Sequence, residues 1–430
     1  MRSDFLKEGE QIEIGGWISK IRDLGNLRFI LIRDMYGVLQ VTLSRDAVNS
    51  KLFEMTNELT NETVVRVKGE VKADMRAPNN LEIIPSHIEI ISKAESPIPL
   101  DTSGRIESGM DVSLDWRCIS LRKAQNYSIF KIQASLVRGM QDYLHSKEFM
   151  HVFTPCLLGS VSESGAEVFP VVYFDKQAVL RQDPQLHREL TIASGFEKIY
   201  EIGPSFRADP SHTPRHLCEY RSCAVELAWI RDEYDIMTIE SELIVHTIER
   251  MVQECEDELN VLGLGVDVPK TPFPILEFPE IYTILEERGK KILWGEDYDR
   301  ESEKILWEHV REEYGCDFFF VNKFPFRSKP FYVMRDDDNQ WARSVDLIFK
   351  GIELSSGGQR EHRYEQLVRN IKEKEMNMEN IEWFIKFFRF GVPPLGGFAV
   401  GVERLTLQLL GLGNIREVTL FPRDTQRLIP

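Results

Sequence analysis

Hydrophobic and polar positions follow two different patterns along this chain. Up to residue 91, apolar and β-branched side chains tend to alternate with polar ones, the period of a strand with one buried face. Beyond residue 113, apolar residues recur at helical spacing in some segments and in short strand-like runs in others. The change of pattern predicts two globular units that differ in secondary structure.

The N-terminal alternation divides into five predicted strands. They cover residues 11–18, 27–32, 38–43, 63–72 and 81–91, with a turn at 34–37 and helical spacing over 49–59. Five strands with a helix after the third is the order of an OB barrel, a fold that often holds single-stranded nucleic acid. A small sandwich without a ligand fits the same pattern, which does not choose between the two.

A proline-containing stretch separates the two units. Residues 96–104 hold two prolines and show no periodicity, as is typical of a linker. We therefore expect a barrel domain at residues 1–92, a linker or hinge at 93–113 and a larger domain at 114–430.

The larger unit mixes helices and strands without strict alternation. Residues 128–145 have an amphipathic helical pattern, a second helix is expected to be capped by Asp235, and a last helix begins near Val402 and stops at Gly411. Strand-like runs cover residues 198–202 and 222–229. This mixture favours an α+β domain around an antiparallel sheet.

Composition narrows the class of protein. The chain has 430 residues, of which 42% are hydrophobic and 28% charged, as in ordinary globular proteins. No apolar run approaches the ~18 residues of a membrane span, and the N-terminus lacks the apolar stretch of a signal peptide, so we expect a cytoplasmic protein with no membrane partner. The six cysteines form no CxxC pair and no zinc-ligand spacing with the nine histidines, and disulfides are not expected in that compartment.

The net charge of −16 argues against unspecific coating of nucleic acid. The charge is unevenly distributed, since the first 98 residues hold 13 Lys and Arg against 15 Asp and Glu. A polyanionic partner would therefore approach the N-terminal unit more easily than the rest.

No common nucleotide-binding loop occurs in the sequence. There is no GxxxxGK[ST] motif, no dinucleotide fingerprint and no GxSxG elbow. A phosphate site would have to be built from side chains on a sheet. Arg207, Arg215 and His216 lie in one strand–loop–strand segment and suit phosphate oxygens, and Tyr220 offers an aromatic face for a base.

Two further clusters follow in the chain. Asp346, Glu353 and Ser356 offer oxygen ligands suited to magnesium, and Gly401-Val-Glu-Arg404 places another arginine at a helix start. Each piece alone would be interpreted as a surface salt bridge. The pieces together, in this order, indicate a nucleotide site.

These pieces resemble motifs 2 and 3 of the class II aminoacyl-tRNA synthetases, and in particular of the aspartyl subgroup. Supporting segments lie at residues 114–122, 154–155 (motif 1), 165–170, 184–186, 353–360 and 421–430. Gly16-Trp17 and residues 22–25 resemble the anticodon-binding barrel of that family, and the compact length resembles its archaeal type. The likeness covers essentially the whole chain, so it implies an OB-fold anticodon-binding domain followed by a class II catalytic domain.

The resemblance implies an ATP-dependent ligase that converts aspartate to aspartyl-adenylate and transfers the aspartyl group to tRNA, with Mg²⁺ as cofactor. Arg207 and Arg404 would be catalytic, with Arg207 on the α-phosphate and Arg404 enclosing the adenine together with Tyr220. The ATP-binding set would be Arg207, Asp209, Arg215, His216, Leu217, Tyr220, Glu353, Gly401 and Arg404.

The resemblance also implies sites for the amino acid, the metal ion and the anticodon. The amino acid would contact Glu163, Gln185, Arg188, Arg207, Ser356 and Arg360, the last reading its side-chain carboxylate. The metal would be held by Glu353 and Ser356, with Asp346 in support. In the barrel, Phe29 would stack on a base, and Gln40 and Glu82 would contact base edges. A plainer interpretation places Phe29 in the core and Gln40 in solvent. Partners would be tRNA(Asp), with tRNA(Asn) left open, and a second copy in a homodimer with Pro155 at its interface.

Several residues near the amino acid depart from the family pattern. Asp183 stands in place of a serine, Arg188 of a lysine, Ser164 of a loop glycine, and Ala224 of the acidic residue that holds the substrate ammonium. Glu163, Asp183 and Glu189 are the candidates to replace that acid. Aspartate is the leading substrate. The alternatives are a paralogue that activates asparagine or another small carboxylic acid, and a tRNA-binding protein without turnover.

Overall fold

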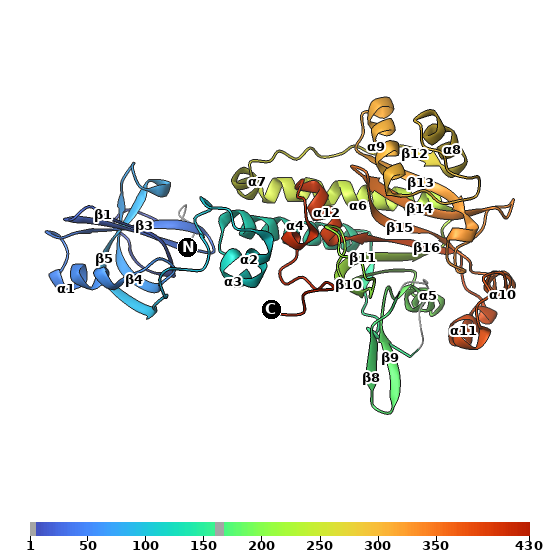
Figure 1. The fold of residues 1–430 in the computed structure, drawn as a ribbon, viewed down its shortest axis with the longest axis horizontal. Coiled ribbons are helices and arrows are strands. Elements are labelled where there is room, and N and C mark those ends of the chain that lie inside the picture. The colour runs from blue at the N-terminus through green and yellow to red at the C-terminus, as the bar shows by residue number, and fades with distance from the viewer. Residues whose placement is uncertain (1–5, 160–166) are drawn as a thin grey trace. The chain divides into compact units, whose positions relative to one another are not determined.

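The computed structural model of the protein describes residues 6–159 and 167–430. The chain packs into two compact units, Met1–Ala124 and Gln125–Pro430 (Figure 1). Every helix in the described parts of the chain is too short or too polar to span a bilayer. All six cysteines are free thiols.

The first unit contains a closed five-stranded barrel. Its strands are β1 (Gln11–Asp23), β2 (Leu27–Asp34), β3 (Gly37–Ser44), β4 (Val64–Ala73) and β5 (Leu81–Ser92), in the order β1-β2-β3-β5-β4. Helix α1 (Ser50–Met55) follows β3 and continues into a 3-10 turn at Thr56–Glu58. Alternate residues such as Ile30 and Ile32 fill the core. The predicted strands, the helix after the third strand and the OB order are confirmed, and the sandwich is excluded.

A buried carboxylate ties the segment after β5 to the barrel. Glu62 accepts hydrogen bonds from Arg33 Nη2 (2.9 Å), Thr102 Oγ1 (2.7 Å) and Arg122 Nη1 (3.0 Å). Short helices α2 (Met110–Asp115) and α3 (Arg117–Ser120) follow. Residues 93–124 thus pack with the barrel, whereas the domain boundaries at residues 92 and 113 remain sequence-based predictions.

The second unit is built on an eight-stranded sheet in the order β12-β13-β14-β15-β16-β11-β10-β6. All neighbours are antiparallel except β12 with β13 and β10 with β6. The predicted α+β domain with an antiparallel sheet is therefore confirmed. The strands are β6 (Met150–His151), β10 (Lys198–Phe206), β11 (Glu219–Ala228), β12 (Ile275–Glu277), β13 (Phe318–Pro325), β14 (Trp341–Phe349), β15 (Ile352–Arg360) and β16 (Leu395–Gly401).

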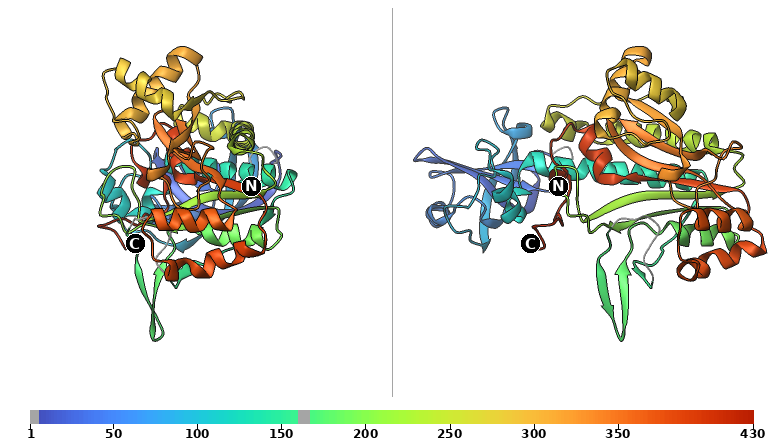
Figure 2. Two further views of the ribbon diagram at one scale, coloured as in Figure 1. Left: turned by 90° about the vertical axis from the view of Figure 1, so that its right-hand side faces the viewer. Right: turned by 45° about the vertical axis from the view of Figure 1, so that its right-hand side comes forward.

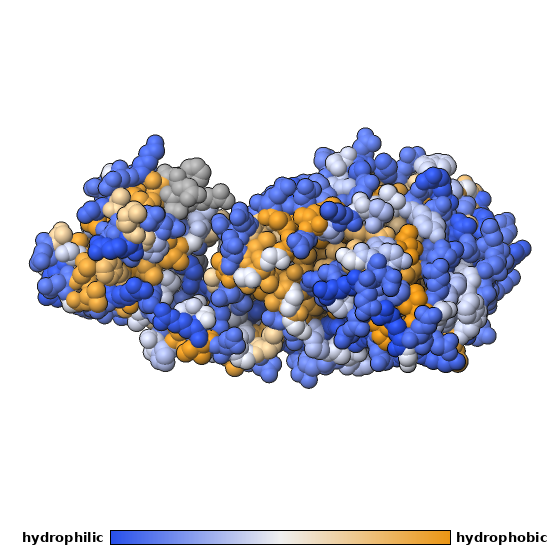
Figure 3. Space-filling view, turned by 90° about the horizontal axis from the view of Figure 1, so that it is seen from above, coloured by the Kyte–Doolittle hydropathy of each residue, from blue (hydrophilic) through white to orange (hydrophobic). Residues whose placement is uncertain are grey.

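Helices cover this sheet and its ends (Figures 1 and 2). The long helices α4 (Ala124–Ser146) and α6 (Glu233–Glu254) bury residues such as Leu136 and Leu243 against Val225 and Val400 of the sheet. The other helices are α5 (Gln185–Ala193), α7 (Glu256–Leu262), α8 (Phe278–Glu287), α9 (Arg300–Tyr314), α10 (Tyr364–Glu373), α11 (Met378–Ile385) and α12 (Val402–Leu409). Strands β7 (Leu157–Leu158), β8 (Pro170–Tyr173) and β9 (Lys176–Leu180) form a small separate sheet whose hairpin projects from the unit. Seen from above, the surface combines hydrophobic patches with larger hydrophilic areas (Figure 3).

One predicted helix start is wrong. Helix α6 begins at Glu233, and the side chain of Asp232 caps it by accepting from the Tyr234 amide. Asp235 lies in the first turn and pairs with Arg231. Apolar residues at helical spacing begin only at Ile236, because the first turn of α6 is polar. The apolar pattern therefore predicts a helix start that is too late. At the other end of the chain, α12 ends at Leu409 and Gly411 takes a left-handed conformation (φ 63°), as the glycine stop predicted.

Candidate active site

Small side chains line the centre of one face of the large sheet. Strand register places Ser222 beside Gly401, Ala224 beside Ala399, and Ala399 beside Ser356. Because residues two apart on a strand share a face, these five positions form one continuous floor. The absence of large side chains there leaves room for a ligand against the sheet.

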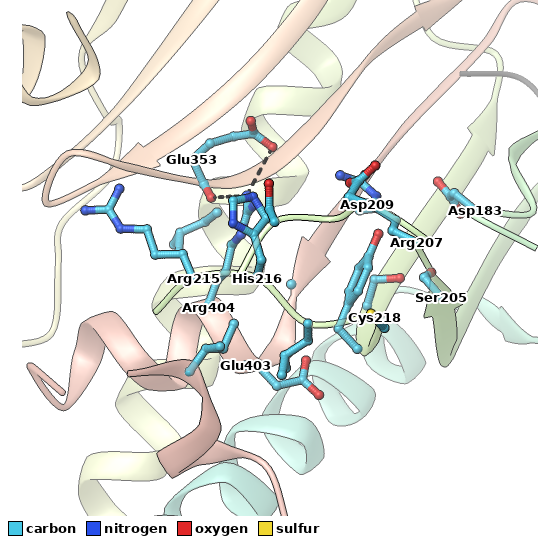
Figure 4. A pocket seen from close by; sticks show the side chains of 18 of the residues that line it. Asp183, Ser205, Arg207, Asp209, Arg215, His216, Cys218, Glu353, Glu403 and Arg404 are labelled. Carbon is cyan, nitrogen blue, oxygen red and sulfur yellow. Dashed lines mark hydrogen bonds and ion pairs between the residues drawn. The ribbon is translucent and has the colours of Figure 1, made fainter. Parts of the chain in front are cut away.

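A cleft opens above this floor (Figure 4). Its walls come from the ends of β10 and β11 with the loop between them, from β15, and from the junction of β16 with α12. All of the residues predicted to bind ATP line it, namely Arg207, Asp209, Arg215, His216, Leu217, Tyr220, Glu353, Gly401 and Arg404. Residues more than 190 positions apart in the sequence, such as Arg207 and Arg404, therefore share one cavity.

Arg207 is a fixed cation at the base of the loop after β10. Its amide donates to the carbonyl of Cys218 (2.9 Å), and its guanidinium carbon lies 5.5 Å from the ring centre of Tyr220. The Coulombic influence of Tyr220, followed by that of Glu353 and Asp183, raises the pKa of Arg207 although burial opposes this. Arg207 is therefore charged and pre-positioned for an anion.

Arg404 stands on the first turn of α12 and faces Glu353 (Figure 4). Its Nη1 donates to the Glu353 carbonyl oxygen (2.8 Å) and lies 3.5 Å from the Glu353 carboxylate. The backbone contact fixes the guanidinium over β15. The Glu353 side chain is 38% exposed, so its carboxylate stays available to a second cation.

The residues predicted to hold a metal ion lie on two paired strands. Asp346 on β14 is the register partner of Ser356 on β15, and Glu353 precedes Ser356 on the same strand. Burial raises the pKa of Asp346 to about 6, against the nearby Lys329 ammonium, whose Nζ is 3.2 Å from Oδ2. Nowhere in residues 6–159 and 167–430 do three His, Cys, Asp or Glu side chains converge as a metal cage. Two carboxylates and a hydroxyl fit Mg²⁺, which usually takes one or two carboxylates and completes its shell with phosphates and water.

Three of the residues predicted to contact the amino acid, Gln185, Arg188 and Arg360, form a buried network, and two others, Arg207 and Ser356, line the cleft. Gln185 Oε1 accepts from Arg188 Nη2 (2.9 Å) and from Arg360 Nη2 (3.3 Å). Arg360 Nε donates to Glu226 Oε1 (2.9 Å), and Arg188 pairs with Asp183 (2.8 Å). Arg188 and Arg360 are only 1% and 5% exposed, so both guanidiniums have fixed orientations.

The three candidates for the substrate ammonium differ in position. Asp183 lines the cleft and has a side chain that is 35% exposed. Glu189 is fully buried and accepts from Gln185 Nε2 (3.1 Å). Glu163, like the neighbouring Ser164, lies outside the described residues. Ala224 lies in the floor, so the missing acid of the family pattern falls within the site itself.

Some residues of the site were missed by the sequence reasoning. Glu226, which holds Arg360, could have been found because it follows Tyr220, Ser222 and Ala224 at alternate positions of one strand. Lys329 beside Asp346 and Arg300 beside His216 carry no such signal, because both come from distant segments.

The predicted anticodon residues gather on the outer face of the barrel. Phe29 on β2 faces Thr42 on β3, and Gln40 on β3 faces Glu82 on β5. Thr42 Oγ1 donates to Glu82 Oε2 (2.6 Å), and Gln40 Nε2 lies 3.4 Å from the same oxygen. Phe29 is half-buried and lies outside the hydrophobic core, so the plainer interpretation of this residue is wrong.

Known protein families match the barrel and the larger unit separately. Residues 109–425 match the family model of class II (D, K and N) tRNA synthetases, and residues 12–91 match an OB-fold nucleic acid binding domain. The chain is 40% identical to the aspartate–tRNA(Asp) ligase of Pyrococcus furiosus over 98% of its own length and 97% of the relative. It is 40% identical to the aspartate–tRNA(Asp/Asn) ligase of Methanopyrus kandleri over 99% and 97%. The asparaginyl-tRNA synthetase of Pyrococcus horikoshii, solved with asparaginyl-adenylate, has a TM-score of 0.92 at 32% identity over 100% of this chain and 98% of its own.

Proposed function

The chain belongs to the class II (D, K and N) tRNA synthetases, and from this membership we propose that it activates aspartate with ATP and transfers the aspartyl group to tRNA. The observation that carries the proposal is the single cleft shared by Arg207, Glu353 and Arg404. Three groups suited to a nucleotide triphosphate, drawn from distant parts of the sequence, converge on one sheet face.

The chemistry needs no protein nucleophile. A carboxylate oxygen of aspartate attacks the α-phosphorus, the bond to the β-phosphate oxygen breaks, and pyrophosphate leaves. A ribose hydroxyl of the tRNA then attacks the acyl carbon, and AMP leaves. Arg207 holds the α-phosphate and the attacking carboxylate together, which supplies proximity and neutralises the charge that spreads in the transition state.

Mg²⁺ would be bound by Glu353 and Ser356, with Asp346 in support. When bound, it would neutralise the phosphate oxygens and so help pyrophosphate to leave. Arg215 and His216 would hold the outer phosphates, and Tyr220 with Arg404 would enclose the adenine.

Asp183 holds the substrate ammonium in place of the acidic residue that the family has at the position of Ala224. Of the two candidates that the structure describes, it is the one that lines the cleft, and its side chain is 35% exposed although both carboxylate oxygens contact Arg188 Nη2 (2.8 and 2.9 Å). Arg360, oriented by Glu226, reads the side-chain carboxylate.

A second substrate is favoured by one observation. The buried network beside the cleft holds two guanidiniums, Arg188 and Arg360, and three carboxylates, Asp183 and Glu226 as their ion-pair partners and Glu189 as an acceptor from Gln185. A neutral side chain such as that of asparagine would enter such a pocket without adding negative charge. Asparagine or another small carboxylic acid is therefore the alternative substrate.

The barrel would read the anticodon of tRNA(Asp), and tRNA(Asn) as a further substrate stays open. A homodimer would form around β6 and the adjoining Pro155. The segment from β6 to β7 exposes Met150 (53%), Phe153 (81%) and Leu157 (45%), and clustered exposed apolar residues are typical of a protein interface. Light scattering should give twice the chain mass of 50.0 kDa, and Phe153→Asp should reduce it to one chain mass.

Exchange of pyrophosphate into ATP, measured with each of the twenty amino acids, tests the proposed activity. A signal with aspartate alone is expected. A signal with asparagine instead selects the alternative substrate. Binding of tRNA with no exchange for any acid would mean a tRNA-binding protein without turnover.

A further inference from the structure

We propose that Arg300, on the first turn of α9, is a further ligand for the outer phosphates of the nucleotide and for the pyrophosphate that leaves. The inference rests on the proposed function, because it extends the same cleft. It concerns a residue that lies outside the three sequence motifs and far along the chain from the loop it contacts.

Arg300 makes a direct contact with the loop between β10 and β11. Its Nη2 lies 2.9 Å from His216 Nε2. An arginine has only donors, so Nε2 must be the acceptor and the imidazole proton sits on Nδ1. Nδ1 then donates to Thr213 Oγ1 (2.6 Å). His216 is thus neutral, and Arg300 places a charged guanidinium directly against a residue that lines the cleft.

Positive charge accumulates around this histidine. Burial, and then Arg300 and Arg404, lower the pKa of His216. Burial likewise lowers the pKa of Arg215, and Arg300 and Arg404 add to the effect while Glu303 opposes it. Within the described part of the chain, neither Arg215 nor Arg300 forms an ion pair. Two guanidiniums that repel each other across a neutral histidine favour a bridging anion with several charged oxygens.

The first turn of α9 brings a second residue, Glu303, near charged residues that line the cleft. Glu303 lies three positions after Arg300, hence on the same helix face, and is half-buried. Burial, and then the charge of Glu353, raise the pKa of Glu303 to about 7, while Arg404 and Arg215 lower it. Glu303 therefore lies near the same charged groups as Arg300.

The helix that carries Arg300 is held firmly. Asp299 caps α9 by accepting from the Ser302 amide (3.0 Å), and the Ser302 side chain is fully buried. The α9 backbone also packs closely on the turn before β15, where a Cβ on Gly351 would lie 3.2 Å from Lys304 Cα. Gly351 lies in the turn between β14 and β15, and Glu353 is on β15. The contact thus fixes the backbone of Arg300 relative to Glu353.

The competing explanation is an exposed arginine that bonds a histidine and otherwise faces water. The two explanations differ in what they predict for ligands with different numbers of phosphates. A ligand for the outer phosphates strengthens the binding of ATP and pyrophosphate and leaves AMP unaffected. A solvated arginine changes none of the three.

The test is equilibrium binding of ATP, AMP and pyrophosphate by calorimetry, with the full-length wild type, Arg300→Ala, Arg300→Lys and the control Arg311→Ala. Arg311 is an exposed arginine further along α9. The Kd for ATP and for pyrophosphate should rise about 10-fold to 100-fold in Arg300→Ala, as expected for a lost charge-assisted hydrogen bond. AMP should bind within about twofold of wild type, and Arg311→Ala should match wild type. Arg300→Lys should have Kd values between those of wild type and Arg300→Ala, because lysine keeps the charge but lacks the planar guanidinium group.

A double-mutant cycle separates direct binding from an action through His216. If Arg300 touches phosphate, Arg300→Ala should weaken ATP binding severalfold further in a His216→Ala background. The absence of any further loss would overturn the proposal. The proposal would also be overturned if Arg300→Ala bound ATP as tightly as wild type, or if its affinity for AMP fell as much as its affinity for ATP. A wild type that binds no ATP would overturn the proposed function as well.

Discussion

The guanidinium groups of the site fall into two classes at the residue scale. Arg188 and Arg360 are buried and already paired with carboxylates, whereas Arg207 and Arg215 line the open cleft. A buried pair contributes little net stability but fixes orientation, since removing either partner leaves an uncompensated charge. We therefore expect the selection of the amino acid to depend on the geometry of Arg188 and Arg360, and the binding of ATP to depend on the net charge of the cleft.

Asp183→Asn tests the proposed ammonium ligand. Loss of the carboxylate should raise the KM for the amino acid at least about tenfold, because losing a partner of a desolvated ammonium costs about 2–5 kcal/mol. The KM for ATP should change much less. Steady-state exchange kinetics measure both, with Asp235→Asn on the surface of α6 as control. An unchanged KM for the amino acid would move the ammonium site elsewhere.

Glu240 gives the catalytic unit a pH dependence. This side chain on α6 is fully buried and accepts from Ser355 Oγ, and burial raises its pKa from 4.5 to about 8. Between these values the folded state binds a proton that the unfolded state has lost. The contribution of Glu240 to the free energy of unfolding is therefore greatest below pH 4.5. It decreases as the pH rises toward 8, by up to about 1.4 kcal/mol per pH unit.

Glu240→Gln should remove this slope, since the amide stays neutral at every pH. Urea unfolding of both proteins should be measured at several pH values from 5 to 9. The free energy of unfolding of the variant should rise relative to that of wild type up to pH 8, and the difference should then stay constant. Glu249→Gln, at an exposed position of the same helix, is the control. Parallel stability curves for Glu240→Gln and wild type would show that Glu240 is ionised in the folded protein.

At the scale of elements, the site depends on how closely β16 approaches its neighbours. A Cβ on Gly397 would lie 2.0 Å from the Val225 carbonyl oxygen and 2.4 Å from the Glu226 carboxylate. The Gly397 carbonyl also accepts from Arg360 Nη2 (3.0 Å). One glycine thus lets the strand close on the pair that orients Arg360.

Gly397→Ala should therefore damage stability and amino-acid binding together. Overpacking between strands should cost about 3 kcal/mol, and the displaced Glu226 should raise the KM for the amino acid. Thermal unfolding and exchange kinetics measure the two effects. Gly413→Ala is the matched control, because a Cβ there meets nothing within 4 Å. A variant as stable as wild type would mean that β16 adjusts without strain.

The sequence was sufficient for those parts of the site that are local in the chain. Arg207, Arg215 and Tyr220 lie on one strand–loop–strand segment, so alternation and spacing place them together. The pairing of Arg360 with Glu226 and of Arg300 with His216 depends on strand order and on the position of α9, which no local pattern encodes. The predicted Asp235 cap is wrong for a different reason, because Asp232 and Asp235 lie only three positions apart and are near-equivalent caps until the backbone is known.

At the scale of the whole molecule, a protein of net charge −16 must bind a polyanion. Local recognition resolves this, since the barrel is close to neutral and its outer face combines Phe29 with its register partner Arg22. Stacking and edge contacts to unpaired bases act at short range, so they tolerate an acidic protein elsewhere. Chemistry and tRNA recognition should then be separable between the two units.

Phe29→Ala and Arg207→Ala test this separation. Phe29→Ala should raise the KM for tRNA by about 10-fold to 100-fold, since stacking on one base contributes about 1–3 kcal/mol, and should leave amino-acid-dependent exchange unchanged. Arg207→Ala should abolish exchange and leave tRNA affinity, measured by filter binding, nearly unchanged. Tyr36→Ala on the β2–β3 turn and Arg231→Ala on the catalytic surface are the matched controls. Loss of both activities in either variant would contradict the division, because it would mean that the anticodon face and the cleft act as one site.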